Sequence, residues 1–99
     1  MKRIADPNFG KALRAVRLAR GLSQEDFDEV SGRTYISQLE RGEKQPTFEK
    51  ICQLASVLGI HPAALVAASF LRSFSSEDVR ALLGVVDAQL VDVGQPKML

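Results

Sequence analysis

Apolar residues recur at intervals of three and four positions along most of this 99-residue chain, a period typical of amphipathic α-helices. Glycine, proline and serine residues interrupt the periodic segments and mark the breaks between them. We therefore expect an all-α chain. Its predicted helices cover residues 7–20, 23–30, 33–41, 48–58, 63–71 and 76–91.

Residues that favour helix ends mark the first two of these segments. Asp6 is the expected N-cap of the first helix, Pro7 takes its first helical position, and Gly21 ends it. Ser23 and Asp26 are spaced for a shortened capping box at the start of the second helix.

The fourth predicted helix carries a continuous apolar stripe between an expected N-cap at Thr47 and a stop at Gly59. The stripe consists of Phe48, Ile51, Leu54, Ala55 and Leu58. His61, a cap or loop residue, and Pro62 open the fifth helix, and we expect residues 93–99 to be a frayed tail.

Composition limits the size and class of the protein. A chain of this length with 45% apolar residues makes one domain, or one domain with a tail, around a small core. The single cysteine, Cys52, excludes an intrachain disulfide and a cysteine-based zinc cage. Since no apolar run reaches signal-peptide or membrane-spanning length, we expect a cytoplasmic protein without a membrane partner.

Charge is unevenly distributed, although the net charge is only +1. Residues 1–22 carry six basic side chains against Asp6, which gives 6 − 1 = +5, whereas residues 51–99 carry three basic and four acidic ones, which gives 3 − 4 = −1. A basic N-terminal part beside a nearly neutral remainder is typical of a molecule with one side facing DNA. A solvated basic helix is the alternative interpretation.

The third predicted helix has the residue types that reading DNA requires. Ile36 and Leu39 form an inward seam. Its opposite, polar side consists of Arg33, Thr34, Ser37 and Gln38. Arginine can hold guanine O6 and N7 through two hydrogen bonds, glutamine can do the same with adenine, and threonine can contact thymine. A merely solvated polar face is the competing reading of these residues.

The second and third predicted helices, joined by a tight turn at Gly32, resemble the helix-turn-helix of the phage-repressor-like (Cro/cI, XRE-type) DNA-binding proteins. The resemblance spans about residues 8–70 and depends on several motifs in order. These are Arg17, Ser23-Gln24-Glu25, Ile36, Leu39-Glu40-Arg41-Gly42, Pro46 and Leu58-Gly59-Ile60. It implies a five-helix lambda-repressor-like DNA-binding domain over residues 1–71, with residues 72–99 as an additional C-terminal helix and tail.

By this resemblance, the family's functional positions fall on particular residues of the chain. The base-contacting positions correspond to Arg33, Thr34, Ser37 and Gln38. Contacts to DNA phosphates are expected from Gln24, Ser23, Tyr35, Arg41, Lys44, Lys11 and Arg14. Ser23 serves mainly as a cap, and Tyr35 suits the edge of the core equally well. The family's partly buried ion pair, which locks the first helix to the third, falls on Arg17 and Glu40.

The chain departs from the family pattern between Gln24 and Ile36, where the segment is shorter than usual. We therefore expect a tighter turn and a shifted start of the third helix. Asp28 occupies a position where the family usually has a small apolar residue. We expect it either to pair with Arg33 or to cap the shortened turn.

The last predicted helix carries an apolar stripe with two alternative uses. It consists of Val79, Leu82, Leu83, Val86 and Leu90. The stripe can close the core of its own chain or pack against a second chain, and we favour a homodimer. Two recognition helices about 34 Å apart then read successive major grooves of an inverted repeat.

No paired carboxylates, nucleophile–base pair or glycine-rich phosphate loop occurs in the sequence, so we expect neither an enzyme nor a metal or cofactor site. The main hypothesis is a sequence-specific, homodimeric transcriptional regulator of a bacterium or prophage, most often a repressor, whose partner is double-stranded DNA. The alternative is an antitoxin, which binds a toxin protein through the C-terminal helix and uses the helix-turn-helix for autoregulation.

Overall fold

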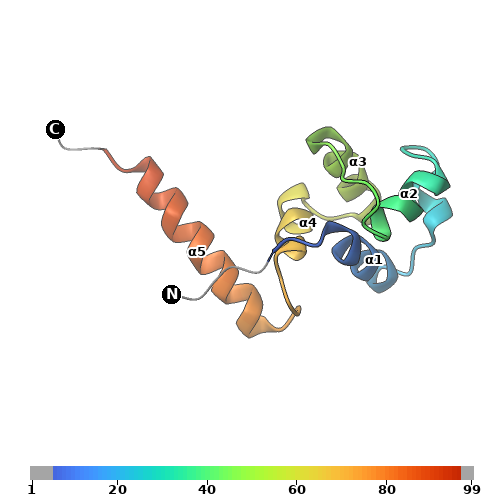
Figure 1. Cartoon of the computed structure of the whole chain (residues 1–99). Coiled ribbons are helices and arrows are strands. Elements are labelled where there is room, and N and C mark those ends of the chain that lie inside the picture. Colours follow the sequence, from blue (N-terminus) through green and yellow to red (C-terminus); the bar gives the residue numbers. More distant parts are fainter. Residues whose placement is uncertain (1–5, 97–99) are drawn as a thin grey trace.

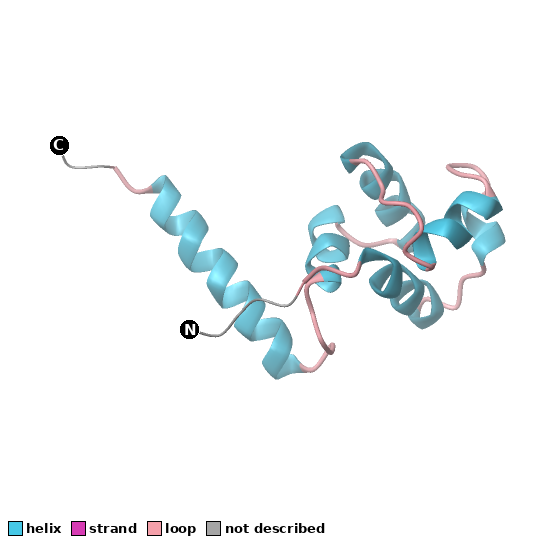
Figure 2. Cartoon of the chain, in the orientation of Figure 1, coloured by secondary structure: helices cyan, strands magenta, loops and turns pink. Residues whose placement is uncertain are grey.

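The computed structural model describes residues 6–96, and within them every regular element is a helix (Figures 1 and 2). The elements are α1 (Phe9–Ala19), the 3₁₀-helix η1 (Gln24–Phe27), α2 (Arg33–Glu40), α3 (Phe48–Leu58), α4 (Pro62–Ser69) and α5 (Ser76–Gly94). The all-α prediction is therefore confirmed. The basic residues Lys2 and Arg3 and the final residues 97–99 of the expected tail lie outside the described residues.

The prediction that Asp6 caps the first helix is wrong, because Asn8 is the N-cap of α1. The side-chain oxygen of Asn8 accepts a hydrogen bond from the backbone N–H of Lys11 at 3.0 Å. Asparagine and aspartate cap helices about equally well, so the local sequence does not choose between the two positions. The later start makes Phe9 the first helical residue, and its ring is buried in the core.

The second predicted helix is a single 3₁₀ turn rather than an α-helix over residues 23–30. The Asp26 carboxylate accepts hydrogen bonds from the backbone N–H of Ser23 at 2.7 Å and from its hydroxyl at 3.2 Å, so the expected pairing of these residues is present. Beyond Phe27, turn residues lead to Ser31. The shortened segment holds too few residues for a full α-helix and a turn. A 3₁₀-helix completes a turn with fewer residues, because its hydrogen bonds join residues three positions apart.

The predicted ends of α3 are confirmed, but the predicted apolar stripe includes one residue that is exposed. The Thr47 hydroxyl accepts from the backbone N–H of Lys50 at 3.1 Å, and Gly59 ends the helix with φ of 71°. Phe48, however, is 78% exposed. Phe48 directly follows the N-cap Thr47 and is not part of the core.

The last two helices also differ at their ends from the predicted ranges. His61 caps α4, as expected, and its Nδ1 accepts from the backbone N–H of Ala63 at 2.9 Å. α4 ends at Ser69 rather than residue 71. α5 continues to Gly94, so the tail predicted to begin at Val93 is still helical there.

The core lies among the first five elements. α1 packs on α2 and α4, while α3 packs on α4 and η1. The buried side chains at its centre are Phe9, Leu13, Phe27, Ile36, Leu39, Leu54, Ala55, Leu58 and Leu65. This core fixes the orientation of α2, since the helix contributes two of these residues.

Two helix backbones approach each other closely at Gly10. A Cβ atom at this position would lie 2.3 Å from the carbonyl oxygen of Leu39 and 2.7 Å from that of Glu40. The first turn of α1 therefore lies directly against the last turn of α2, and only a residue without a side chain fits there.

α5 stands apart from this core. None of its residues is buried, and Figure 1 shows the helix projecting away from α1 to α4. The radius of gyration is 15.4 Å, against about 13 Å for a compact chain of this length. Among the described residues, no single helix has both the length and the apolar character to cross a membrane. Only α3 and α4 together meet those criteria, as a pair bent by 105°.

Candidate nucleic-acid interface

The candidate interface is built on α2, which has one buried and one polar side. Ile36 and Leu39 are fully buried. The side chains predicted to contact bases divide into two groups, because Arg33 and Thr34 are exposed whereas Ser37 and Gln38 are half-buried. The helix begins at Arg33, immediately after the turn glycine, so all four lie on the same regular helix.

A buried ion pair joins α1 to the C-terminal end of α2. The Arg17 guanidinium donates from Nε to Glu40 Oε2 at 2.7 Å and from its second terminal nitrogen to Oε1 at 2.9 Å. Its remaining terminal nitrogen donates to the Leu22 carbonyl oxygen at 3.0 Å. Arg17 is only 8% exposed. The hydrogen bond to Glu40 raises the pKa of Arg17, so this side chain stays charged at every ordinary pH.

Gln24 joins the same network from η1. Its amide nitrogen donates to Glu40 Oε1 at 3.2 Å. The Glu40 carboxylate thus holds three elements together, namely α1 through Arg17, η1 through Gln24 and its own helix α2. The sequence suggested a phosphate contact for Gln24 but gave no signal for this hydrogen bond, because it depends on how η1 lies against α2.

The start of α2 is held by an exposed ion pair. Arg33 lies 3.0 Å from Glu25 in η1, and both side chains are more than half exposed. Asp28 is not the partner of Arg33, so that alternative is wrong. Glu25 replaces Asp28 as the partner because the 3₁₀ turn places Glu25 beside the start of α2.

The exit of α2 carries a second group of linked side chains. Arg41 donates to the Ser37 hydroxyl and to the Glu43 carboxylate. The hydrogen bond raises the pKa of Arg41 and lowers that of Glu43. Lys44 follows as an exposed residue in the loop before α3. Ser37 and Arg41 therefore lie close enough to act together at one edge of α2.

Tyr35 packs against the core and is contacted by a lysine that sequence reasoning did not assign. The Lys50 ammonium lies 5.8 Å from the centre of the Tyr35 ring, within the range of a cation–π interaction. Lys50 also donates to the carbonyl oxygen of Val30 in the turn before α2. These contacts tie α3 to the turn, and no sequence spacing could indicate them.

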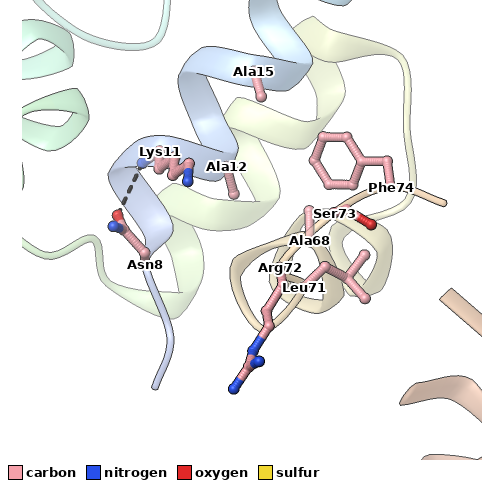
Figure 3. Close-up of a pocket in the computed structure, with 9 residues that line it drawn as sticks. All are labelled: Asn8, Lys11, Ala12, Ala15, Ala68, Leu71, Arg72, Ser73 and Phe74. Carbon is pink, nitrogen blue, oxygen red and sulfur yellow. Dashed lines mark hydrogen bonds between the residues drawn. The ribbon is translucent and has the colours of Figure 1, made fainter. Parts of the chain in front are cut away.

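The two predicted phosphate ligands of α1 are exposed but differ in their surroundings. Arg14 is exposed on the middle of the helix. Lys11 lines a small cavity between α1 and the end of α4, together with Arg72 (Figure 3). Figure 3 shows the Arg72 side chain extending away from α1.

The predicted dimer residues lie along α5. Val79 and Leu82 are half-buried beside α4, whereas Leu83, Val86 and Leu90 are exposed. The side chains assigned to DNA and those assigned to dimer formation thus occupy different parts of the molecule.

Comparisons with known proteins agree with this geometry. A family model described as helix-turn-helix matches residues 13–65, more than half of the chain. The chain is similar to y4dJ, an uncharacterized HTH-type transcriptional regulator of Sinorhizobium fredii (strain NBRC 101917 / NGR234), with 35% identity over 68 residues that cover 67% of this chain and 83% of that protein. It is also similar to control protein C.BamHI of Bacillus amyloliquefaciens, with 36% identity over 61 residues that cover 59% and 75%. No solved structure gives a significant match.

Proposed function

Because this chain belongs to the phage-repressor-like (XRE-type) helix-turn-helix family of DNA-binding transcriptional regulators, we propose that it recognises a specific double-stranded sequence as a homodimeric repressor. The observation that carries the proposal is the polar outer side of α2. This helix is anchored on its other side by two fully buried residues and at its end by the Arg17–Glu40 pair. A recognition helix needs such rigid support, because base contacts are short and directional.

In this proposal α2 enters the major groove and reads bases with Arg33, Thr34, Ser37 and Gln38. Gln38 supplies an amide that matches adenine N6 and N7. Arg33 keeps further N–H donors beside its ion pair with Glu25, and these suit guanine O6 and N7. Each well-formed bidentate contact discriminates by about 1–3 kcal/mol.

Phosphate contacts then set the register of α2 on the duplex without reading sequence. The side chains assigned to them are Gln24, Ser23, Tyr35, Arg41, Lys44, Lys11 and Arg14. Gln24 suits this role because its amide nitrogen has two N–H groups, and only one is needed for Glu40. It would therefore link a phosphate oxygen to the network that holds α2.

Two observations support the homodimer. One recognition helix makes few base contacts, and the apolar stripe of α5 is largely exposed. Two copies related by a two-fold axis would place their recognition helices in successive major grooves, about 34–36 Å apart, and read an inverted repeat. A dimer bound in this way at a promoter would exclude other proteins from the same DNA. We assign the repressor role for this reason. Its place of action is the cytoplasm, where bacterial DNA lies.

A second candidate function is that of an antitoxin, and the exposed helix α5 favours it. In that case α5 would bind a toxin protein, while the helix-turn-helix would regulate the pair's own promoter. The two functions differ in what the isolated chain can do, because an antitoxin that requires its partner for tight DNA binding would select no site alone.

Selection of bound duplexes from a random DNA pool, followed by sequencing, tests the proposal. The regulator predicts enrichment of an inverted repeat, and affinity for that site should fall by about 10³–10⁵ between 50 and 200 mM salt if 6–10 phosphates are contacted. The variant Gln38→Ala should enrich a site with relaxed preference at one base pair. Weak, salt-sensitive binding with no enriched sequence would refute the proposal.

A further inference from the structure

An open apolar groove of about 480 Å³ lies where α1, α4 and the first turns of α5 meet. Its surface comes mainly from small and branched apolar side chains, including Val16, Ala64, Ala67, Leu71 and Leu82. Among the described residues, Arg20 is the charged side chain that lines it. Such a groove within a small chain is suited to an apolar helix rather than to a polar ligand.

The same chain carries an apolar helix face that nothing described in it covers. Val79, Leu82 and Leu83 line the groove, and at 100° per residue the stripe continues on the same face through Val86 and Leu90 to Val93. Exposure along this stripe rises from 40% at Val86 to 65% at Leu90 and 75% at Val93. The distal half of α5 is therefore an unpaired amphipathic helix, of the type that the groove would accept.

The charges of the groove and of α5 are complementary. α5 has one basic and four acidic residues, so its net charge is 1 − 4 = −3; these are Arg80, Glu77, Asp78, Asp87 and Asp92. Arg20 lies at the α1 end of the groove, and Lys11 and Arg72 line the cavity that adjoins it (Figure 3). A second acidic helix would thus meet basic side chains at both ends of the apolar surface.

The chain also exposes more surface than a compact monomer of its mass. The accessible surface is 7226 Å², whereas a compact monomer of 10.8 kDa exposes about 5500 Å². The excess of about 1700 Å² exceeds the roughly 800 Å² that each partner contributes to a stable interface. A partner that covers the groove and the distal part of α5 would remove part of this exposed surface from water.

We propose that α5 of a second copy of this chain occupies the groove, so that two chains exchange their C-terminal helices around a two-fold axis. The arrangement rests on the proposed function for its purpose, which is to present two recognition helices, but not for its physical basis. Each chain carries both the groove and the helix. A two-fold axis therefore places the α5 of each chain in the groove of the other, and no further copy can add to the dimer. Figure 1 shows α2 at the end of the molecule opposite to α5, so the exchange leaves α2 free.

Sedimentation of three single variants tests both surfaces. Leu90→Lys places a charge in the docking stripe, and Ala64→Glu places one in the groove, where Ala64 is exposed in the first turn of α4 and an acid suits the helix dipole. Each should raise the dimer dissociation constant at least about tenfold. The control Ala88→Lys, on the opposite face of α5, should leave it unchanged. A monomeric wild type, or a dimer broken by Leu90→Lys and untouched by Ala64→Glu, would overturn the helix exchange.

Cross-linking then identifies which surfaces meet. In a Cys52→Ser background, chains carrying Ala64→Cys are mixed with chains carrying Leu90→Cys and oxidised. The exchange predicts a disulfide between the two different chains, whereas predominant linkage of Leu90→Cys chains to each other would contradict it. The wild-type DNA selection separates the two proposals: a dimer that enriches an inverted repeat but is unaffected by Ala64→Glu refutes the exchange alone, and a cross-linked dimer that enriches no site refutes the proposed function alone.

Discussion

Replacing Arg17 with methionine removes the cation at the centre of the network that holds α2. The Arg17 and Glu40 side chains are 10% and 5% exposed, and Arg17 makes two hydrogen bonds to the carboxylate and one to the Leu22 carbonyl. Methionine fills a similar apolar space but donates nothing. The Glu40 carboxylate would then keep one hydrogen bond, from Gln24 at 3.2 Å.

The cost follows from leaving that carboxylate buried without its counter-charge. Breaking a fully buried ion pair from one side destabilises a protein by about 3–5 kcal/mol. Because both side chains are nearly buried, we expect Arg17→Met to lose about 3 kcal/mol. The total stability of a domain of this size is about 5–15 kcal/mol, so the melting temperature should fall by more than about 10 °C. Arg17→Lys keeps the charge but loses the bidentate hydrogen bonds to Glu40. Its stability should lie between those of Arg17→Met and the wild type.

Urea unfolding followed by circular dichroism measures this loss, and the double variant Arg17→Met/Glu40→Leu provides the control. Removing both charges should recover most of the stability, since the penalty comes from the unpaired carboxylate. At a temperature where Arg17→Met is folded, its order of preference among DNA sites should match that of the wild type. An unchanged stability together with altered base preferences would refute a structural role for the pair.

Two further pairs of substitutions, each a variant with its control, test the packing and capping of α1 by the same unfolding measurement. Gly10→Ala should lose about 1–3 kcal/mol, because its Cβ meets two backbone carbonyl groups, whereas Gly84→Ala, with open space around it, should be neutral or stabilising by up to about 1 kcal/mol. Equal effects at the two glycines would contradict the close approach of α1 to α2. Asn8→Ala should cost about 1 kcal/mol and Asp6→Ala close to nothing, and the reverse order would restore Asp6 as the cap.

The helical fold and several helix ends were predictable because they depend on local chemistry. Thr47 and His61 cap the helices that follow them through bonds to residues two or three positions away. The start of α1 was not predictable in this way, because Asp6 and Asn8 are both good caps and the burial of Phe9 distinguishes them. Gly10 was not singled out from the sequence, because the close approach there depends on how α1 lies against α2.

The rest of the candidate interface depends on contacts between distant segments. The shortened segment before Ile36 indicated a tighter turn, but its 3₁₀ form decides that Glu25, not Asp28, reaches Arg33. The hydrogen bond from Gln24 to Glu40 depends on the same turn. The apolar stripe of α5 was readable from its period, whereas its position away from the core was not, because periodicity identifies a face and not the surface that covers it.

Base reading by α2 is tested by measuring the affinity of Gln38→Ala for every single-base variant of the selected half-site. We expect Gln38→Ala to lose about 1–3 kcal/mol of discrimination at one base pair, with unchanged preferences elsewhere. The matched control Gln95→Ala, just beyond α5, should behave as the wild type. An equal loss of affinity for all variants, or no loss for any, would contradict base reading by Gln38 on α2.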